Sequence, residues 1–131
     1  MSTNKYGLAA VEAVKLCTAQ PGLSPIDAWG FAVARHFPNS QTSRAKCCPR
    51  DAFLGLCEDG LIQGIKRGSY TRSVRNKRYA LEAVVALKKD PTLSKKALWD
   101  RIHRDEMKQH NSQMDVVLGL WEANLLCDMS R

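Results

Sequence analysis

The chain has 131 residues, of which 44% are hydrophobic and 25% charged, as in one folded domain and unlike a disordered chain. No apolar run approaches the roughly 18 residues that a membrane helix needs, and Glu12 and Lys15 interrupt the apolar N-terminal stretch. We therefore expect no membrane segment and no signal peptide, and the net charge of +7 becomes the feature to explain.

Three helices are predicted in the first half of the chain. The first, over residues 4–19, carries apolar residues at the i, i+1, i+4, i+7 spacing of one helical face. The second begins at Ser24, a good N-cap residue, and contains Trp29, which we expect in the core. The third follows Pro49 and closes at Gly60, because glycine readily adopts the left-handed conformation that ends a helix.

A basic segment, residues 66–78, follows these helices and accounts for almost all of the net charge. Its sequence, KRGSYTRSVRNKR, contains six Lys and Arg residues and no acid, whereas the other 118 residues hold 14 basic and 13 acidic ones. The charge excess is therefore a local patch and not a property of the whole surface.

The second half repeats the first. Residues 80–99 align with 10–29 at an offset of 70 with eight of 20 identities, and residues 115–126 align with 51–62 at an offset of 64 with six of 12. The first half has about eight extra residues around SRAKCCPR. The alignment predicts helices over about 74–89, from the N-cap Ser94 to about residue 108, and from Ser112, whose spacing to Asp115 is typical of a capping box, to Asn124.

These elements predict an all-α fold made of two tandem three-helix repeats that pack as one pseudo-two-fold helical domain. We expect a single domain over 1–131, with repeat one at about 4–65, a basic linker at 66–73 and repeat two at about 74–128. A unit of about 60 residues is only marginally stable alone, so the two repeats should pack on each other.

Three stretches also resemble a small bacterial domain family of unknown function, and the resemblance covers most of the chain. They read CPRDAFLGLCEDGLIQGI, SYTRSVRNKRYAL and HNSQMDVVLGLWEANLL. The resemblance implies a bacterial cytoplasmic protein, and it carries no activity and no catalytic residues.

The basic segment predicts a site for anions, with the phosphates of nucleic acid as the first candidate. Clustered cations neutralise phosphates, and an aromatic ring among them offers a stacking face. Arg75, Lys77 and Arg78 lie in or beside the first turn of the predicted helix over about 74–89, where cations oppose the helix dipole. Such an unfavourable placement of three cations favours a functional reason for their presence. The predicted site consists of Arg44, Lys46 and Arg50 from the extra residues of the first half, and of Lys66, Arg67, Tyr70, Arg72, Arg75, Lys77 and Arg78.

Other interpretations of the same residues stay open. The segment is also compatible with a solvated linker, or with a site for another polyanion or an acidic protein. The function we expect is that of a non-enzymatic binding protein. The alternatives are an adaptor that holds a protein partner between the repeats and a small enzyme at the repeat interface, where Glu58 and Glu122 recur. A reader of base sequence in duplex DNA is disfavoured, because the third helix of each repeat is mostly apolar.

The cysteines and histidines give no strong motif for a metal or a cofactor. The five cysteines show no disulfide framework, and reduced thiols in the cytoplasm are the default. Cys47 and Cys48 are adjacent, and we interpret them as small residues beside a helix start in preference to a redox or metal pair. His103 and His110 are expected on a polar helix and at its end. We expect no cofactor, no metal and no catalytic residue.

Overall fold

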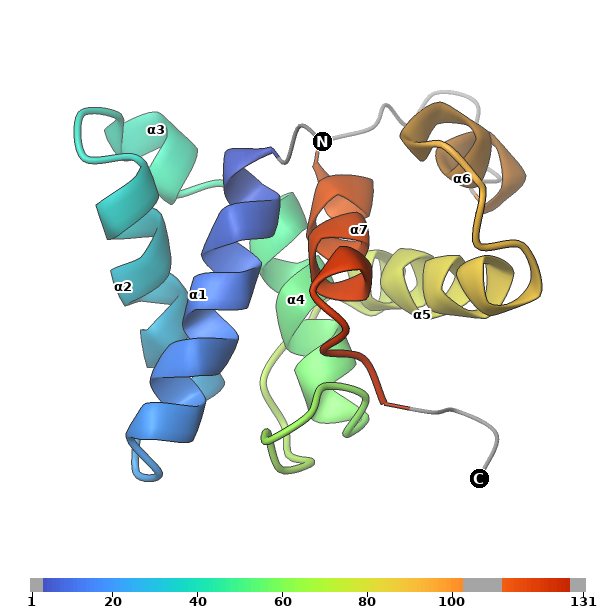
Figure 1. The fold of residues 1–131 in the computed structure, drawn as a ribbon. Helices are drawn as coiled ribbons and strands as arrows, with labels where there is room; N and C mark the ends of the chain where they lie inside the picture. The colour runs from blue at the N-terminus through green and yellow to red at the C-terminus, as the bar shows by residue number, and fades with distance from the viewer. Residues whose placement is uncertain (1–3, 103–111, 128–131) are drawn as a thin grey trace.

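The computed structural model describes residues 4–102 and 112–127, and these residues form helices and the segments that connect them (Figure 1). The all-α prediction is confirmed for this part of the chain. The helices are α1 (Lys5–Ala19), α2 (Pro25–His36), α3 (Gln41–Arg44), α4 (Cys47–Glu58), α5 (Val74–Lys89), α6 (Lys95–Ile102) and α7 (Gln113–Glu122). The short α3 begins just before the extra residues of the first half, and the sequence analysis does not predict it.

Serine side chains begin several of the helices. Ser24 accepts a hydrogen bond from the N–H of Asp27 (3.1 Å), and Ser94 accepts one from the N–H of Ala97 (3.1 Å), so both predicted N-caps are confirmed. The capping box at Ser112 is wrong. That residue has a φ of 69° and no side-chain cap bond. The predicted continuation of the helix after Ser94 beyond residue 102, with His103 and His110, lies outside the described residues.

The ends of α4 and α7 are closed in the same way. Gly60 has a φ of 73° and Asn124 a φ of 60°, as predicted. The N–H of Leu61 then bonds the carbonyl of Leu56 (3.1 Å), and the N–H of Leu125 bonds that of Leu120 (3.0 Å). This is the Schellman arrangement, which satisfies carbonyls that a helix end leaves without partners.

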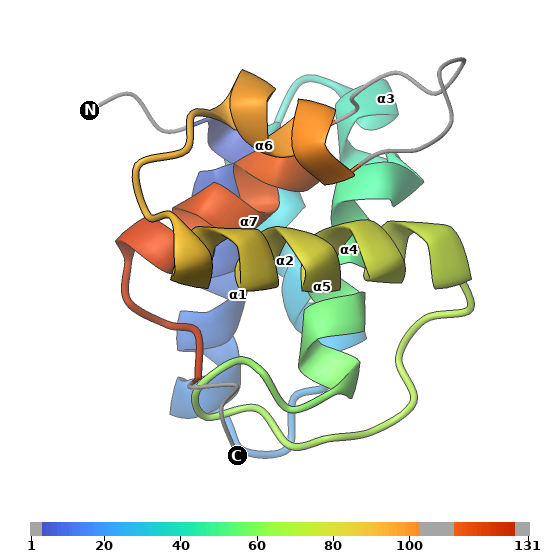
Figure 2. The same cartoon turned by 90° about the vertical axis from the view of Figure 1, so that its right-hand side faces the viewer.

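Two helix crossings join the halves of the chain at glycines. α1 packs on α2 on one side and on α7 on the other, while α5 runs across α4 and α7 (Figures 1 and 2). A Cβ on Gly119 of α7 would stand 2.7 Å from the Cα of Gly7 in α1. A Cβ on Gly55 of α4 would stand 2.8 Å from the Cα of Lys77 in α5. Only glycine at positions 55 and 119 permits these approaches, so both crossings depend on the absence of a side chain there.

The segments that follow α4 and α7 pair with each other. Ile62 and Leu126 form an isolated antiparallel β-bridge, and both side chains are buried. The N–H of Gln63 donates to the carbonyl of Leu125 (2.9 Å), and the N–H of Cys127 donates to that of Leu61 (2.7 Å). Two loops that are distant in sequence are thereby tied together below the helices.

The core contains the predicted tryptophans. Trp29 is buried and stacks on Phe53, with 5.3 Å between the ring centroids. Trp99 is buried and meets Tyr79 edge-on at 4.9 Å. Both contacts join a second helix of one half to a neighbouring core helix, which confirms that these rings serve packing.

Candidate nucleic-acid interface

One carboxylate anchors the basic segment, residues 66–78, to the end of α4. Oε1 of Glu58 accepts hydrogen bonds from the backbone N–H groups of Tyr70 (2.7 Å) and Thr71 (3.1 Å), and Oε2 accepts one from the ammonium of Lys77 (2.7 Å). These partners, Lys77 first, lower the pKa of Glu58 from 4.5 to about 2. The carboxylate is therefore charged at neutral pH and fixes the path of the segment.

Lys77 has a structural role that the sequence did not reveal. Its ammonium also lies 2.8 Å from Oδ1 of Asp59, and the hydrogen bonds from Asp59 and then Glu58 raise the pKa of Lys77. The sequence predicts that this cation opposes the dipole of α5. In the structure its charge lies against the C-terminal end of α4, where a cation is favourable. Its position therefore has a reason within the fold.

Three other cations of the predicted site are also held by protein groups. Arg67 donates from Nε to the backbone carbonyl of Asp59 (3.2 Å). Arg78 donates to Glu82 one turn further along α5 (3.3 Å). Arg44 donates to an uncharged amide oxygen within α3 (2.8 Å). These three side chains have less freedom to bind a ligand than their charge suggests.

The remaining cations are exposed and more available. Arg50 bonds the carboxylate of its neighbour Asp51 (3.2 Å), and its side chain remains 45% exposed. The others make no ion pair within the described part of the chain: Lys46, Lys66, Arg72 and Arg75. Of the nine predicted cations, these four thus have no ion pair in the described ranges, and Arg50 is paired but partly exposed.

The structure brings Arg50, Arg72 and Tyr70 together at one cavity, which we call the junction hollow. It lies between the starts of α2 and α4 and the basic segment, and its volume is about 560 Å³. Its lining consists of Ile26, Cys47, Arg50, Asp51, Leu54, Tyr70, Thr71, Arg72 and Ser73. Arg50 of the first-half insertion and four residues of the basic segment thus line one cavity, whereas Arg44 and Lys46 do not line it.

Two further hollows flank the junction hollow along the chain. One, of about 450 Å³, shares Tyr70 with it and is also lined by Lys66. The other, of about 300 Å³, shares Arg72 and is also lined by Arg78. In Figure 2 the segment between α4 and α5 runs along the lower edge and up the right-hand side. The basic segment therefore forms a track with concave surface beside it.

Asp51 is the site residue that the sequence analysis missed. It is buried at the floor of the junction hollow and accepts a hydrogen bond from the hydroxyl of Thr71 (3.0 Å). Asp115, at the aligned position of the second half, is also buried and binds Lys95 (3.0 Å). The signal that could have identified it is an acid that recurs at the aligned position of two mostly apolar helices.

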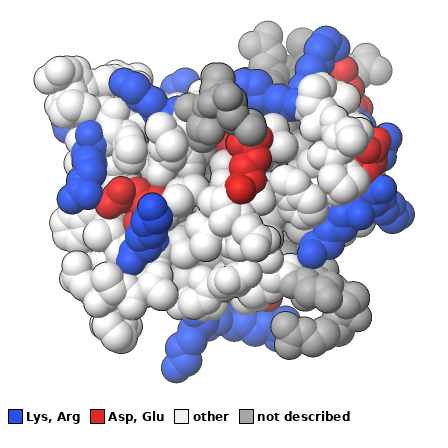
Figure 3. Space-filling view, in the orientation of Figure 1, with Lys and Arg blue, Asp and Glu red and all other residues white. Residues whose placement is uncertain are grey.

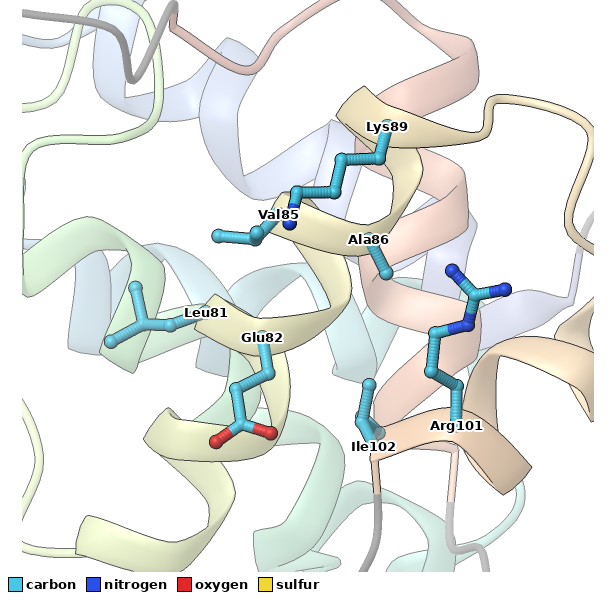
Figure 4. A pocket seen from close by; sticks show the side chains of 7 residues that line it. All are labelled: Leu81, Glu82, Val85, Ala86, Lys89, Arg101 and Ile102. Atoms are coloured by element: carbon cyan, nitrogen blue, oxygen red, sulfur yellow. The ribbon is translucent and has the colours of Figure 1, made fainter.

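A separate apolar pocket lies between α5 and α6, and none of the predicted site residues lines it. Its volume is about 390 Å³, and Figure 4 shows Leu81, Val85 and Ile102 around it with Lys89 and Arg101 at its edge. All of its lining residues belong to the second half of the chain, so it does not lie between the two halves.

The residues considered for catalysis or metal binding are not brought together. Glu58 is bound by the basic segment, while Glu122 is exposed at the end of α7. Cys47 is exposed and Cys48 buried at the start of α4. Within the described ranges, no three His, Cys, Asp or Glu side chains are grouped so as to hold a metal ion.

The face seen in Figure 3, over α1 and α7, is mostly uncharged, with Lys and Arg side chains toward its edges. The later part of the basic segment lies on another side of the molecule (Figure 2). In residues 4–102 and 112–127, no helix is both long and apolar enough to cross a membrane.

Comparison with known proteins gives one match. The model of a family of unknown function matches residues 3–127, which is nearly the whole chain. Neither the curated proteins nor the solved structures contain a match.

Proposed function

Because the chain belongs to this family of unknown function, DUF6979, we propose a function from its own residues: a non-enzymatic module that binds phosphate-rich polymers, nucleic acid first, through a basic face at the junction of its halves. The observation that supports this most is the junction hollow, where Arg50 and Arg72 come from distant segments to one cavity.

The charge on this face suits a polyanion. Lys66, which lines the flanking hollow at Tyr70, is exposed and makes no ion pair in the described ranges. The same holds for Lys46, directly before α4, and for Arg75, three residues after Arg72, and we count these three with the two arginines of the hollow. Each phosphate that a Lys or Arg neutralises releases condensed counterions, and affinity then falls steeply as salt rises. Five cations give a salt-dependent affinity without any catalytic group.

Glu58 argues against acid–base catalysis at the same place. A general base works best when its pKa lies near the working pH. The pKa of Glu58 is about 2, and its oxygens already accept bonds from two N–H groups and one ammonium. We therefore interpret this carboxylate as the support of a binding segment and not as a reacting group.

The test compares two triple variants of equal charge. One neutralises Lys66, Arg72 and Arg75 with glutamine. The control neutralises Lys15, Lys88 and Lys89, which are also exposed but line neither the junction hollow nor its two flanking hollows. Binding of labelled oligonucleotides is measured by anisotropy at about 50 and about 200 mM salt. We expect the slope of log K against log salt to fall in magnitude by about 2 to 3 in the first variant and little in the control.

Two results would contradict this function. One is that the wild-type protein binds neither DNA nor RNA at low salt. The other is that both triple variants lose affinity equally, because binding would then follow net charge and not the face. A protein partner, the alternative function, would be favoured by the first result.

We also propose that the chain is a duplicated three-helix unit with a pseudo-two-fold axis between the halves. Gly55 and Gly119 are aligned at the offset of 64, and each lies at a close crossing with a helix of the other half. The two hydrogen bonds of the β-bridge are equivalent under the same offset. Gln63, which donates to Leu125, aligns with Cys127, which donates to Leu61, and Leu61 aligns with Leu125. The basic face then lies where the duplicated units join.

A further inference from the structure

We propose that the junction hollow takes an unstacked nucleobase, so that the ligand is single-stranded nucleic acid and not a duplex. The inference rests on the proposed function and narrows it to one class of ligand. It comes from the chemistry of the cavity floor, which differs from that of its rim.

The floor of the hollow suits a base better than a phosphate. Asp51 is buried there, and its carboxylate accepts hydrogen bonds from Arg50 (3.2 Å) and from the hydroxyl of Thr71 (3.0 Å). A phosphate that entered the hollow would compete with this carboxylate for Arg50, whereas the carboxylate oxygens keep acceptor sites for a further donor. Carboxylates instead accept hydrogen bonds from the amino groups of bases. Ile26, Leu54 and the ring of Tyr70 supply apolar surface for a flat ring. A partly apolar floor with one carboxylate therefore matches a base.

The rim of the hollow suits the backbone of the same strand. Arg72 carries its charge on an exposed side chain with no ion pair in the described ranges, so a phosphate bound there stays in contact with water. Arg50 is paired with Asp51, but 45% of its side chain remains exposed at the same rim. Lys66 lies further along, at the flanking hollow that shares Tyr70. A chain with bases inside and phosphates outside would thus follow the basic segment from one hollow to the next.

A duplex does not match this arrangement. Its bases are paired and stacked, and it presents phosphates to a protein surface. Single strands expose bases that stack on aromatic rings and enter clefts, and stacking contributes affinity for any base. Tyr70 is a wall shared by two hollows, and its ring is held by the contact with Gly68 and by the bond from its hydroxyl to the carbonyl of Lys66 (2.8 Å). It is thus a rigid surface for stacking.

The experiment separates bases from charge. Wild-type protein is titrated with a single-stranded oligonucleotide of about 12 nucleotides as DNA and as RNA, with the matching duplex, and with an abasic oligomer of equal charge. We expect the single strands to bind about tenfold more tightly than the abasic oligomer, and more tightly than the duplex at equal salt.

A pair of variants at Cys47 tests the hollow itself. Cys47→Trp fills the cavity from an exposed position without changing charge, and Cys47→Ser keeps the cavity open. Circular dichroism and the salt slope check that each variant is folded and keeps its cationic rim. We expect Cys47→Trp to bind single strands only as tightly as the abasic oligomer, and Cys47→Ser to retain the full difference.

The outcomes distinguish the two proposals. If duplex and abasic oligomer bind as tightly as the single strands, the basic face stands and the base-binding hollow is overturned. If Cys47→Trp keeps the preference for bases, the hollow is also overturned. If no oligomer binds the wild-type protein, both proposals fail.

Discussion

At the scale of single residues, Glu58 determines how the basic segment lies. Its carboxylate accepts hydrogen bonds from two backbone N–H groups and from the ammonium of Lys77, so the protein itself supplies one anion that the basic segment binds. Cationic segments repel themselves, and one internal carboxylate with three donors offsets part of that repulsion. Because Glu58 holds the backbone at Tyr70 and Thr71, it also sets the position from which the neighbouring side chain of Arg72 extends.

Replacing Glu58 tests this role. The pKa of Glu58 is lowered from 4.5 to about 2, so the ionised form stabilises the fold above pH 4.5, and this contribution is lost as the pH falls toward 2. We expect Glu58→Gln to lower the free energy of unfolding by about 1–2 kcal/mol at pH 7 and to flatten its pH dependence between these values. Urea unfolding from pH 7 to pH 2 measures both effects.

The aligned residue in the second half provides the control for Glu58. Glu122 is exposed, so Glu122→Gln should leave stability nearly unchanged. An equal loss in the two variants would show that Glu58 does not anchor the segment.

At the scale of elements, the helices meet where side chains are absent. α7 approaches α1 at Gly119 and Gly7, and α4 approaches α5 at Gly55 and Lys77. These contacts are between backbones or next to them, so no rotamer change can relieve an added methyl group. The position of α5 across α4 also brings Lys77 to Glu58, and the crossing therefore supports the binding segment.

A methyl group at Gly119 is expected to separate α7 from α1. Its Cβ would lie 2.7 Å from the Cα of Gly7, so Gly119→Ala should cost about 1–3 kcal/mol of unfolding free energy. Gly30→Ala, in the exposed part of α2 with no atom within 4 Å of the new Cβ, should instead stabilise by about 0.5–1 kcal/mol. Chemical denaturation compares the two, and similar effects at both sites would refute the close crossing.

At the scale of the whole molecule, the halves share their packing. α1 of the first half lies on α7 of the second, and α5 of the second lies on α4 of the first. The amide of Gln113 in α7 donates to the side-chain oxygen of Asn76 in α5 (3.1 Å, buried). The β-bridge between Ile62 and Leu126 adds a further link. Neither half therefore has a complete core of its own.

Shared packing predicts that the halves unfold together. Ala13 in α1 and Ala83 in α5 correspond at the sequence offset of 70, and both are fully buried. Their amides should exchange with solvent deuterium at opening free energies within about 1 kcal/mol of each other. Native-state hydrogen exchange by NMR measures both sites in one sample. A clearly lower value at either site would mean that one half opens alone.

The sequence by itself determined the local structure of this protein. Ser24 and Ser94 begin helices, and Gly60 and Asn124 end them, because the signals lie within a few residues of the ends. The concentration of Lys and Arg in residues 66–78 also follows directly from the sequence. Ser112 is an exception among the predicted helix starts, because its backbone is in the left-handed conformation, which serine does not favour and the sequence therefore does not predict.

Only the tertiary structure decided which of these cations remain available. Lys77 and Arg67 lie in the same charged run as Arg72, yet groups at the end of α4 hold the first two. The junction hollow depends in the same way on the approach of Asp51 to Thr71, which are 20 residues apart. These contacts form between segments that are distant in sequence and that meet only when the helices pack. The local pattern of charge therefore does not predict them.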